Sequence, residues 1–132
     1  MDKQTKSILD MFDEKMLSKS YTERASFLRT ISYPEFGLRD FVEGISKNEK
    51  EMLCEKILEL LYTDINDHVR YYAADALGKM GNKGLVDKLN KKLDFSRMNE
   101  FYFAINTREY SESEIKRKVE QSVIEILNRE EN

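Results

Sequence analysis

The sequence predicts an all-α protein, and three observations lead to that prediction. One proline and five glycines in 132 residues are too few for the many turns of a strand-rich sandwich. Leu, Lys, Glu, Ile and Met, which favour helices, are abundant. Apolar residues recur at helical spacing in successive segments. With 40% hydrophobic residues, a chain of this length is expected to form one domain around a single core.

Four helices are expected before residue 64. Ser20 with Glu23 is typical of a capping box that opens the second helix, and Asn48 with Glu51 is typical of one that opens the fourth. Pro34 ends the second helix, because the residue before a proline is displaced from the helical region. The four apolar faces consist of Ile8, Phe12 and Met16; Phe27, Leu28 and Ile31; Leu38, Phe41, Val42 and Ile45; and Leu53, Ile57, Leu60 and Leu61.

Three or four further helices are expected after residue 64, about seven or eight in all. Asp67 is expected to cap the fifth, and Ser111 with Glu114 to form a capping box at the last. Gly78 and Gly81 permit close packing and a left-handed helix end. The aromatic stretch 95–110 is expected to form one short irregular helix at most. The other apolar faces consist of Val69, Ala73, Ala76, Leu77 and Met80; Leu85, Leu89 and Leu93; and Ile115, Val119, Val123, Ile126 and Leu127.

An internal period relates the middle helices. A shift of 31 residues places Leu38-Arg39 on Val69-Arg70, and a shift of 32 places Leu53, Ile57 and Leu61 on Leu85, Leu89 and Leu93. Such a helix pair cannot bury its apolar faces alone and must stack on neighbours. We therefore divide the domain 1–132 into an N-terminal helix pair (1–32), two repeats (33–62 and 64–93) and a degenerate C-terminal capping repeat (94–132).

One of these repeats carries a specific motif. Asp64, Val69-Arg70, Ala73-Ala74 and Ala76-Leu77-Gly78 are followed by a second helix with spaced leucines. Residues 64–93 thereby resemble a HEAT repeat of the phycobilisome-lyase-like kind, and residues 33–62 resemble a weaker copy. The resemblance implies an α-solenoid of stacked antiparallel helix pairs. It also implies a protein that binds other proteins, as most members of that family do, and not an enzyme.

The sequence offers little for catalysis or metal binding. The segment from Gly78 to Gly84 follows a helix and lacks the Gly-Lys-Ser/Thr ending of a phosphate-binding loop. His68, the only histidine, has no visible triad partners and is interpreted as a solvated or capping residue. Cys54, the only cysteine, is expected to be a buried, unreactive thiol. We expect no enzymatic activity, no cofactor and no metal.

The sequence also bears on location. The longest apolar run, from Phe101 to Ile105, is far shorter than a membrane-spanning helix requires. The first residues are mixed in charge and contain no apolar segment typical of a secretory signal. We expect a cytoplasmic protein that does not bind membranes.

Charge placement suggests a candidate binding surface. Residues 48–75 carry seven acids against three bases, and residues 76–98 carry six bases against two acids. In the fourth helix the glutamates form an acidic row with a tyrosine beside it, which predicts a partner-binding surface that consists of Glu51, Glu55, Glu59, Tyr62, Tyr71, Asp87 and Lys91. The alternative is internal pairing, because the repeat shift aligns Glu51 with Lys83 and Glu59 with Lys91.

Three functions are compatible with these observations. The first is a protein-binding module for one protein partner, which would be basic if the acidic row is the site; an immunity protein that neutralises a basic toxin is an example. The second is a nucleic-acid-binding protein of the HEAT-like kind, supported by the basic stretch from Lys79 to Arg97 but disfavoured by a net charge of −3 and a pI of about 5.4. The third is a small lyase or chaperone, implied only by the family resemblance.

Overall fold

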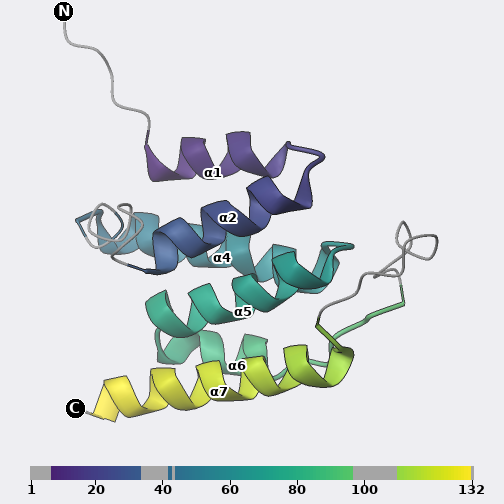
Figure 1. Cartoon of the computed structure of the whole chain (residues 1–132). Helices are drawn as coiled ribbons and strands as arrows, with labels where there is room; N and C mark the ends of the chain where they lie inside the picture. Colours follow the sequence, from purple (N-terminus) through teal and green to yellow (C-terminus); the bar gives the residue numbers. More distant parts are fainter. Residues whose placement is uncertain (1–6, 34–41, 43, 97–109, 132) are drawn as a thin grey trace, which may run out of the picture.

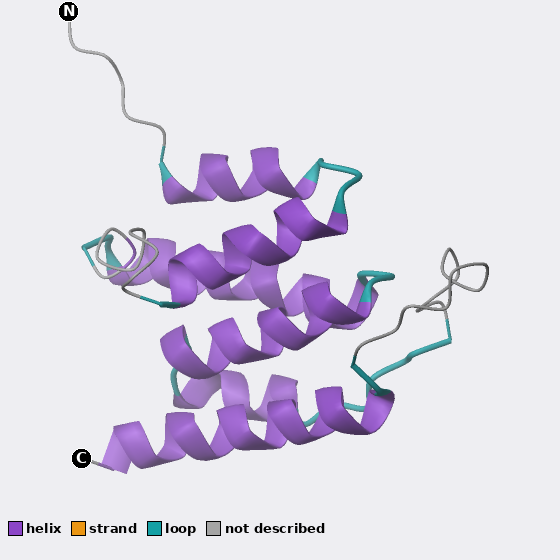
Figure 2. Cartoon of the chain, viewed as in Figure 1, coloured by secondary structure: helices purple, strands orange, loops and turns teal. Residues whose placement is uncertain are grey.

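The computed structural model describes residues 7–33, 42, 44–96 and 110–131, and these residues contain α-helices and no strand (Figure 2). The prediction of an all-α protein is therefore confirmed for this part of the chain. The segment that contains Leu38 and Phe41 lies outside the described residues, as does most of the aromatic stretch 95–110. The helices are α1 (Ile8–Met16), α2 (Tyr21–Ser32), α4 (Lys47–Thr63), α5 (Asp67–Met80), α6 (Val86–Leu89) and α7 (Glu112–Glu131), and the 3-10 turn η2 (Lys83–Leu85) precedes α6.

The helices form two layers (Figure 1). In that view α1, α2, α5 and α7 lie one beneath another in front, while α4 and α6 lie behind them. Helix α5 is central, because it packs against α2, α4 and α7. Its predicted apolar face is confirmed: the side chains that are at most 5% exposed include Val69, Ala73, Ala76, Leu77 and Met80.

Two of the predicted helix starts, those of α4 and α5, are wrong, and the start of α2 lacks the predicted capping box. Helix α4 is capped by Ser46, whose Oγ accepts a hydrogen bond of 3.1 Å from the Glu49 amide in a capping box. This pair has the same three-residue spacing as the predicted Asn48 and Glu51, and it comes first along the chain. Ser20 is the N-cap residue of α2, as predicted, but its side chain makes no capping hydrogen bond.

The predicted cap of α5 is wrong, and the predicted cap of α7 is confirmed. Asn66, not Asp67, caps α5, and its Oδ1 accepts a 3.1 Å hydrogen bond from the Val69 amide. Asp67 is buried, and its carboxylate accepts a hydrogen bond from the Tyr110 amide at 2.8 Å. The capping box predicted at Ser111 and Glu114 is confirmed by reciprocal hydrogen bonds of 3.0 and 3.1 Å.

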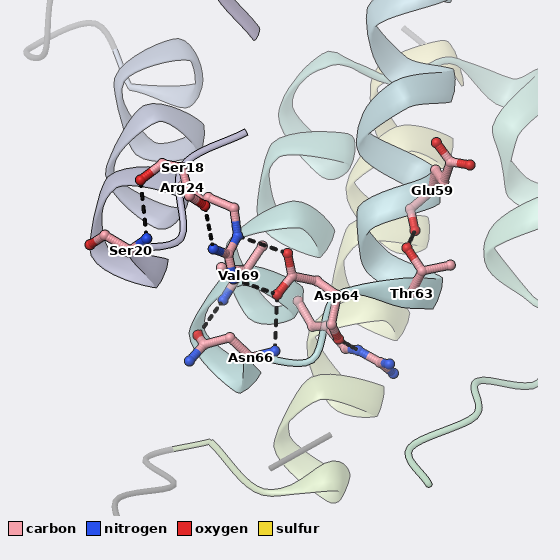
Figure 3. Close-up of polar contacts among 9 residues, drawn as sticks. Ser18, Ser20, Arg24, Glu59, Thr63, Asp64, Asn66 and Val69 are labelled. Carbon is pink, nitrogen blue, oxygen red and sulfur yellow. Dashed lines mark hydrogen bonds and ion pairs between the residues drawn. The ribbon is translucent and has the colours of Figure 1, made fainter. Parts of the chain in front are cut away.

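A buried polar junction joins α2 to the turn before α5 (Figure 3). The guanidinium of Arg24 donates two hydrogen bonds of 3.0 Å to the carboxylate of Asp64 and one of 2.9 Å to the carbonyl of Ser18. Arg70 donates to the carbonyls of Asp64 at 2.5 Å and Asp94 at 2.8 Å. Arg24 thus joins α2 to the turn before α5, and Arg70 joins that turn to the segment after α6. The two guanidinium groups therefore fix how α2 and α5 lie relative to these segments.

Helices α5 and α7 approach each other closely. A Cβ at Gly78 would lie 2.6 Å from Ser122 Oγ, and this hydroxyl donates a 2.7 Å hydrogen bond to the carbonyl of Ala74. The close packing predicted at Gly78 is therefore observed. The left-handed helix end is wrong, because the C-cap residue Gly81 has φ −73° and ψ 166°, which is extended backbone. Its carbonyl and that of Gly78 accept hydrogen bonds from Arg129.

Candidate functional site

Tyrosines gather on the front layer of the structure. Five of the seven tyrosines in the sequence lie in or next to α2, α5 and α7, and all five are half-buried. We call this surface the tyrosine face, and define it by Tyr21, Tyr33, Tyr71, Tyr72 and Tyr110. Half-buried rings can pack against the core on one edge and contact a partner with the other.

The spacing of residues in α5 places its contribution on one side of the helix. His68, Tyr71, Tyr72, Asp75 and Lys79 follow one another at intervals of three or four residues or of one. Residues at these intervals form a continuous stripe along a helix. This stripe runs between α2 and α7, which both pack against α5. The neighbouring helices therefore add their own tyrosines to its two edges.

The rings contact one another across the three helices. Tyr71 stacks on Tyr110, with centroids 4.1 Å apart and an angle of 17° between the planes. Tyr72 meets both rings edge to face, at 5.5 and 6.1 Å, and its hydroxyl lies 3.3 Å from that of Tyr110. His68 lies between Tyr110 at 5.0 Å and Tyr21 at 5.3 Å. Such contacts hold each ring in a defined orientation.

Cations from the same helices lie over three of the rings. The ammonium or guanidinium groups are within the range in which the ring quadrupole attracts a cation. The pairs are Arg29 over Tyr72 at 5.3 Å, Lys79 over Tyr33 at 5.4 Å and Lys118 over Tyr71 at 5.6 Å. The tyrosine face is therefore aromatic with interspersed positive charge.

A buried carboxylate lies beneath this face. Asp75 is 2% exposed; it accepts a hydrogen bond from the Tyr33 hydroxyl and forms a 3.0 Å ion pair with Lys118. Burial and this carboxylate raise the pKa of Tyr33. Burial acts to lower the pKa of Lys118, but its contact with Asp75 outweighs burial and raises it. Tyr33 and Lys118 are thus held protonated, and each is fixed in place by the same buried acid.

The glutamates predicted as a binding surface lie on the other layer. Glu51, Glu55 and Glu59 are exposed on α4; we call them the glutamate row. The carboxylate of Glu55 pairs with the ammonium of Lys88 in α6. The alternative prediction pairs Glu51 with Lys83 and Glu59 with Lys91. The ion pair found between α4 and α6 instead joins Glu55 to Lys88.

The remaining predicted site residues divide between the two layers. Tyr62 is half-buried against the core, and its hydroxyl donates a hydrogen bond to the carbonyl of Lys88. Burial raises its pKa. Asp87 and Lys91 are exposed in and just after α6. Tyr71, by contrast, belongs to α5, which lies in the front layer (Figure 1), and its ring stacks on that of Tyr110. The structure therefore joins Glu55 and Tyr62 of α4 to Lys88 of α6, and it places Tyr71 on α5 among the other tyrosines.

Sequence reasoning missed most of the tyrosine face. The sequence predicts a solvated or capping role for His68, whereas its ring packs between those of Tyr21 and Tyr110. The signal that was available is the stripe in α5, which repeats at helical spacing but consists of aromatic and charged residues. Tyr21 and Tyr110 are distant in sequence, and only the packing of the helices brings them to this stripe.

The described ranges, residues 7–33, 42, 44–96 and 110–131, contain neither a metal site nor a membrane span. Within these ranges no three His, Cys, Asp or Glu residues come close enough together to hold a metal ion. No helix in the same part of the chain is both long and apolar enough to cross a bilayer. A scan against protein-family models, a search of curated proteins and a search of solved structures each found no match.

Proposed function

We propose that this chain is a non-catalytic protein-binding module and that the tyrosine face is its binding surface. The observation that carries the proposal is the gathering of five half-buried tyrosines from three helices on one face. Tyrosine is enriched at the energetically dominant positions of protein interfaces, because its ring buries a large area and its hydroxyl remains able to bond. It also has few rotatable bonds to order on binding.

The contacts within the face support this role. Tyr71 is held by its stack on Tyr110 and by Lys118, and Tyr72 is held by Arg29. Side chains that are ordered before binding reduce the entropy lost on association. A partner would meet rings that are already oriented, which favours slow dissociation.

The glutamate row is the weaker candidate for the main contact. Glu55 already pairs with the side chain of Lys88. The hydroxyl of Tyr62 donates a hydrogen bond to the backbone carbonyl of Lys88. Exposed charges contribute more to the rate of association than to the affinity. We therefore assign the glutamate row the role of steering a basic partner, and the neutralisation of a basic toxin is a narrower form of this proposal.

We further infer that the chain is a HEAT-like α-solenoid of seven or eight helices. Arg24 and Arg70 support this inference, because each occupies the fourth position of its helix and both contact Asp64. Asp64 and Asp94 also behave alike: each carboxylate accepts a hydrogen bond of 2.9 Å from the amide two residues later. In a solenoid, equivalent helices lie side by side and form an extended binding face.

Site-specific photo-crosslinking in the native host tests the proposal. A benzophenone amino acid is placed at Tyr71, at Glu59 in the glutamate row or at Leu17, which is 83% exposed on α1. The expected result is one dominant protein adduct from position 71 that survives nuclease treatment, with little adduct from Leu17. An adduct formed equally at all three positions, or lost with nuclease, contradicts the proposal.

A further inference from the structure

A cavity of about 500 Å³ lies at the end of the structure where α4 begins and where α5 and α7 end. These three helix ends lie on the same side in Figure 1. We propose that this cavity binds a small organic anion that joins an apolar chain to a carboxylate. None of the five tyrosines lines this cavity, although Lys79 on its rim also lies over Tyr33, so the proposal does not rest on the proposed protein partner.

The floor of the cavity is apolar. Cys54, Met80 and Leu85 line it and are between 4% and 6% exposed, and Gly81 contributes backbone without a side chain. A volume of this size falls within the roughly 300–1,000 Å³ of typical small-molecule sites. An apolar chain that enters would displace water from these surfaces, which is favourable.

The rim of the cavity is mainly positive. Lys47, Lys50, Lys79 and Arg129 line it, against Glu51 and Glu55. Glu55 pairs with Lys88, and Lys79 pairs with Glu125 at 3.3 Å, so the remaining rim charges are Lys47, Lys50 and Arg129 against Glu51. The chain as a whole has a net charge of −3, so the excess of cations at this end runs against the overall balance.

Hydrogen bonds hold one of these positive groups in place. Arg129 donates hydrogen bonds to the carbonyls of Gly78 at 2.9 Å and Gly81 at 2.6 Å, which fixes its guanidinium beside the end of α5. The first turn of α4, a helix of 17 residues, begins at Lys47 on the same rim, but α5 and α7 end there, so the dipoles of the three helices do not favour an anion overall. The attraction for an anion therefore comes from the lysine and arginine side chains.

The thiol on the floor has a packing role. Burial raises the pKa of Cys54 to about 11, although Lys50 acts in the opposite direction. A thiol with this pKa is protonated at neutral pH and is a poor nucleophile. The cavity is therefore suited to reversible binding of an amphipathic anion, with the apolar chain on the floor and the carboxylate near Lys50.

A titration of the ¹⁵N-labelled full chain with octanoate, followed by NMR, tests this proposal. Octanoate has the required chemistry, and 1-octanol is the matched probe without charge. Saturable shifts are expected at the amides of Cys54, Gly81 and Gly84, and 1-octanol should bind at least several-fold more weakly. Shifts centred on the tyrosine face, no saturable shifts, or equal binding of the alcohol would overturn the proposal.

A pair of variants locates the anion. Lys50→Glu is expected to weaken octanoate binding by about tenfold or more, as for the loss of a charge-assisted contact. Lys92→Glu changes the net charge equally at an exposed lysine outside the cavity lining, and it should change the affinity less than twofold. Equal effects of the two variants would contradict a local site. Tighter binding of N-acetyl-alanyl-leucine than of octanoate would reassign the cavity to the end of a protein chain and overturn the proposal.

Discussion

Arg24 in α2 and Asp64 at the end of α4 are 40 residues apart in sequence and are joined by two hydrogen bonds of 3.0 Å each. Their side chains are 10% and 7% exposed, so water screens this ion pair little. Asp64 also accepts a hydrogen bond from the Asn66 amide, and Asn66 caps α5. One carboxylate thus links the orientation of α2 to the start of the central helix.

Asp64→Ala is expected to lower the free energy of unfolding by about 3 kcal/mol, because Arg24 would keep a buried charge without its partner. Urea unfolding followed by circular dichroism measures the change. The double variant with Arg24→Met should be less destabilised than the sum of the two single variants. A loss below about 1 kcal/mol in Asp64→Ala would show that the junction contributes no more than an exposed pair.

Gly78→Ala is expected to destabilise the protein, although alanine ordinarily favours a helix over glycine by about 1 kcal/mol. The added methyl group would lie 2.6 Å from Ser122 Oγ and 2.8 Å from Ser122 Cβ, so α5 and α7 would have to separate. Overpacking of this kind costs about 1–3 kcal/mol. Thermal unfolding gives the sign, and Gly78→Ala with Ser122→Gly should recover part of the loss. An increase in Tm for the single variant would contradict the close contact.

The outcome for α5 shows how much of the fold periodicity predicts. Its apolar residues recur at helical spacing, and the side chains at those positions are buried in the structure. Periodicity is less informative about boundaries, because Ser46 with Glu49 and Asn48 with Glu51 have the same spacing and both satisfy the capping pattern. Leu93 is buried as predicted, yet α6 ends at Leu89, so burial alone does not extend a helix.

The candidate site was harder to predict than the core, for a physical reason. The hydroxyl of Tyr62 bonds to a backbone carbonyl, a group that every residue carries, so no sequence pattern identifies this contact. The stack of Tyr71 on Tyr110 depends on the packing of α7 against α5. Sequence spacing showed that Tyr71 lies off the apolar face of its helix, but not which neighbouring helix would meet it.

Stability is expected to decrease as the pH rises above about 10, the ordinary pKa of tyrosine. Burial and Asp75 raise the pKa of Tyr33 in the folded state, so the folded protein retains a proton that the unfolded chain releases. Lys118 has a raised pKa and acts in the same direction over this range. The stabilisation is complete below pH 10 and is lost as the pH approaches the folded-state pKa values.

Thermal unfolding of the wild type and of Tyr33→Phe measures this effect. The measurements run from about pH 8 to about pH 11.5, a range that includes the ordinary pKa values of tyrosine and lysine. The variant lacks the hydroxyl, so its Tm should fall less steeply above pH 10, even if it starts lower because a hydrogen bond to Asp75 is missing. Parallel curves for the two proteins would show that Tyr33 does not carry the alkaline transition.

The two faces are expected to affect partner binding differently. Tyr71→Ala removes a ring held by Tyr110 and Lys118, and a residue at the centre of an interface typically costs about 2 kcal/mol or more when truncated. This corresponds to about a 30-fold faster dissociation, because changes within an interface act mainly on the off-rate. Tyr71→Phe retains the ring and should stay within about threefold of the wild type.

Glu59→Lys, on the opposite layer, should instead slow association with a basic partner at low salt and have little effect at high salt. Surface plasmon resonance measures both rates, with the partner protein that photo-crosslinking from position 71 has identified. Circular dichroism first establishes that each variant retains its helices. If Tyr71→Ala binds like the wild type while Glu59→Lys abolishes binding at all salt concentrations, the glutamate row is the main contact. The assignment of the tyrosine face would then be wrong, because truncation of its central stacked ring would have left the interface intact.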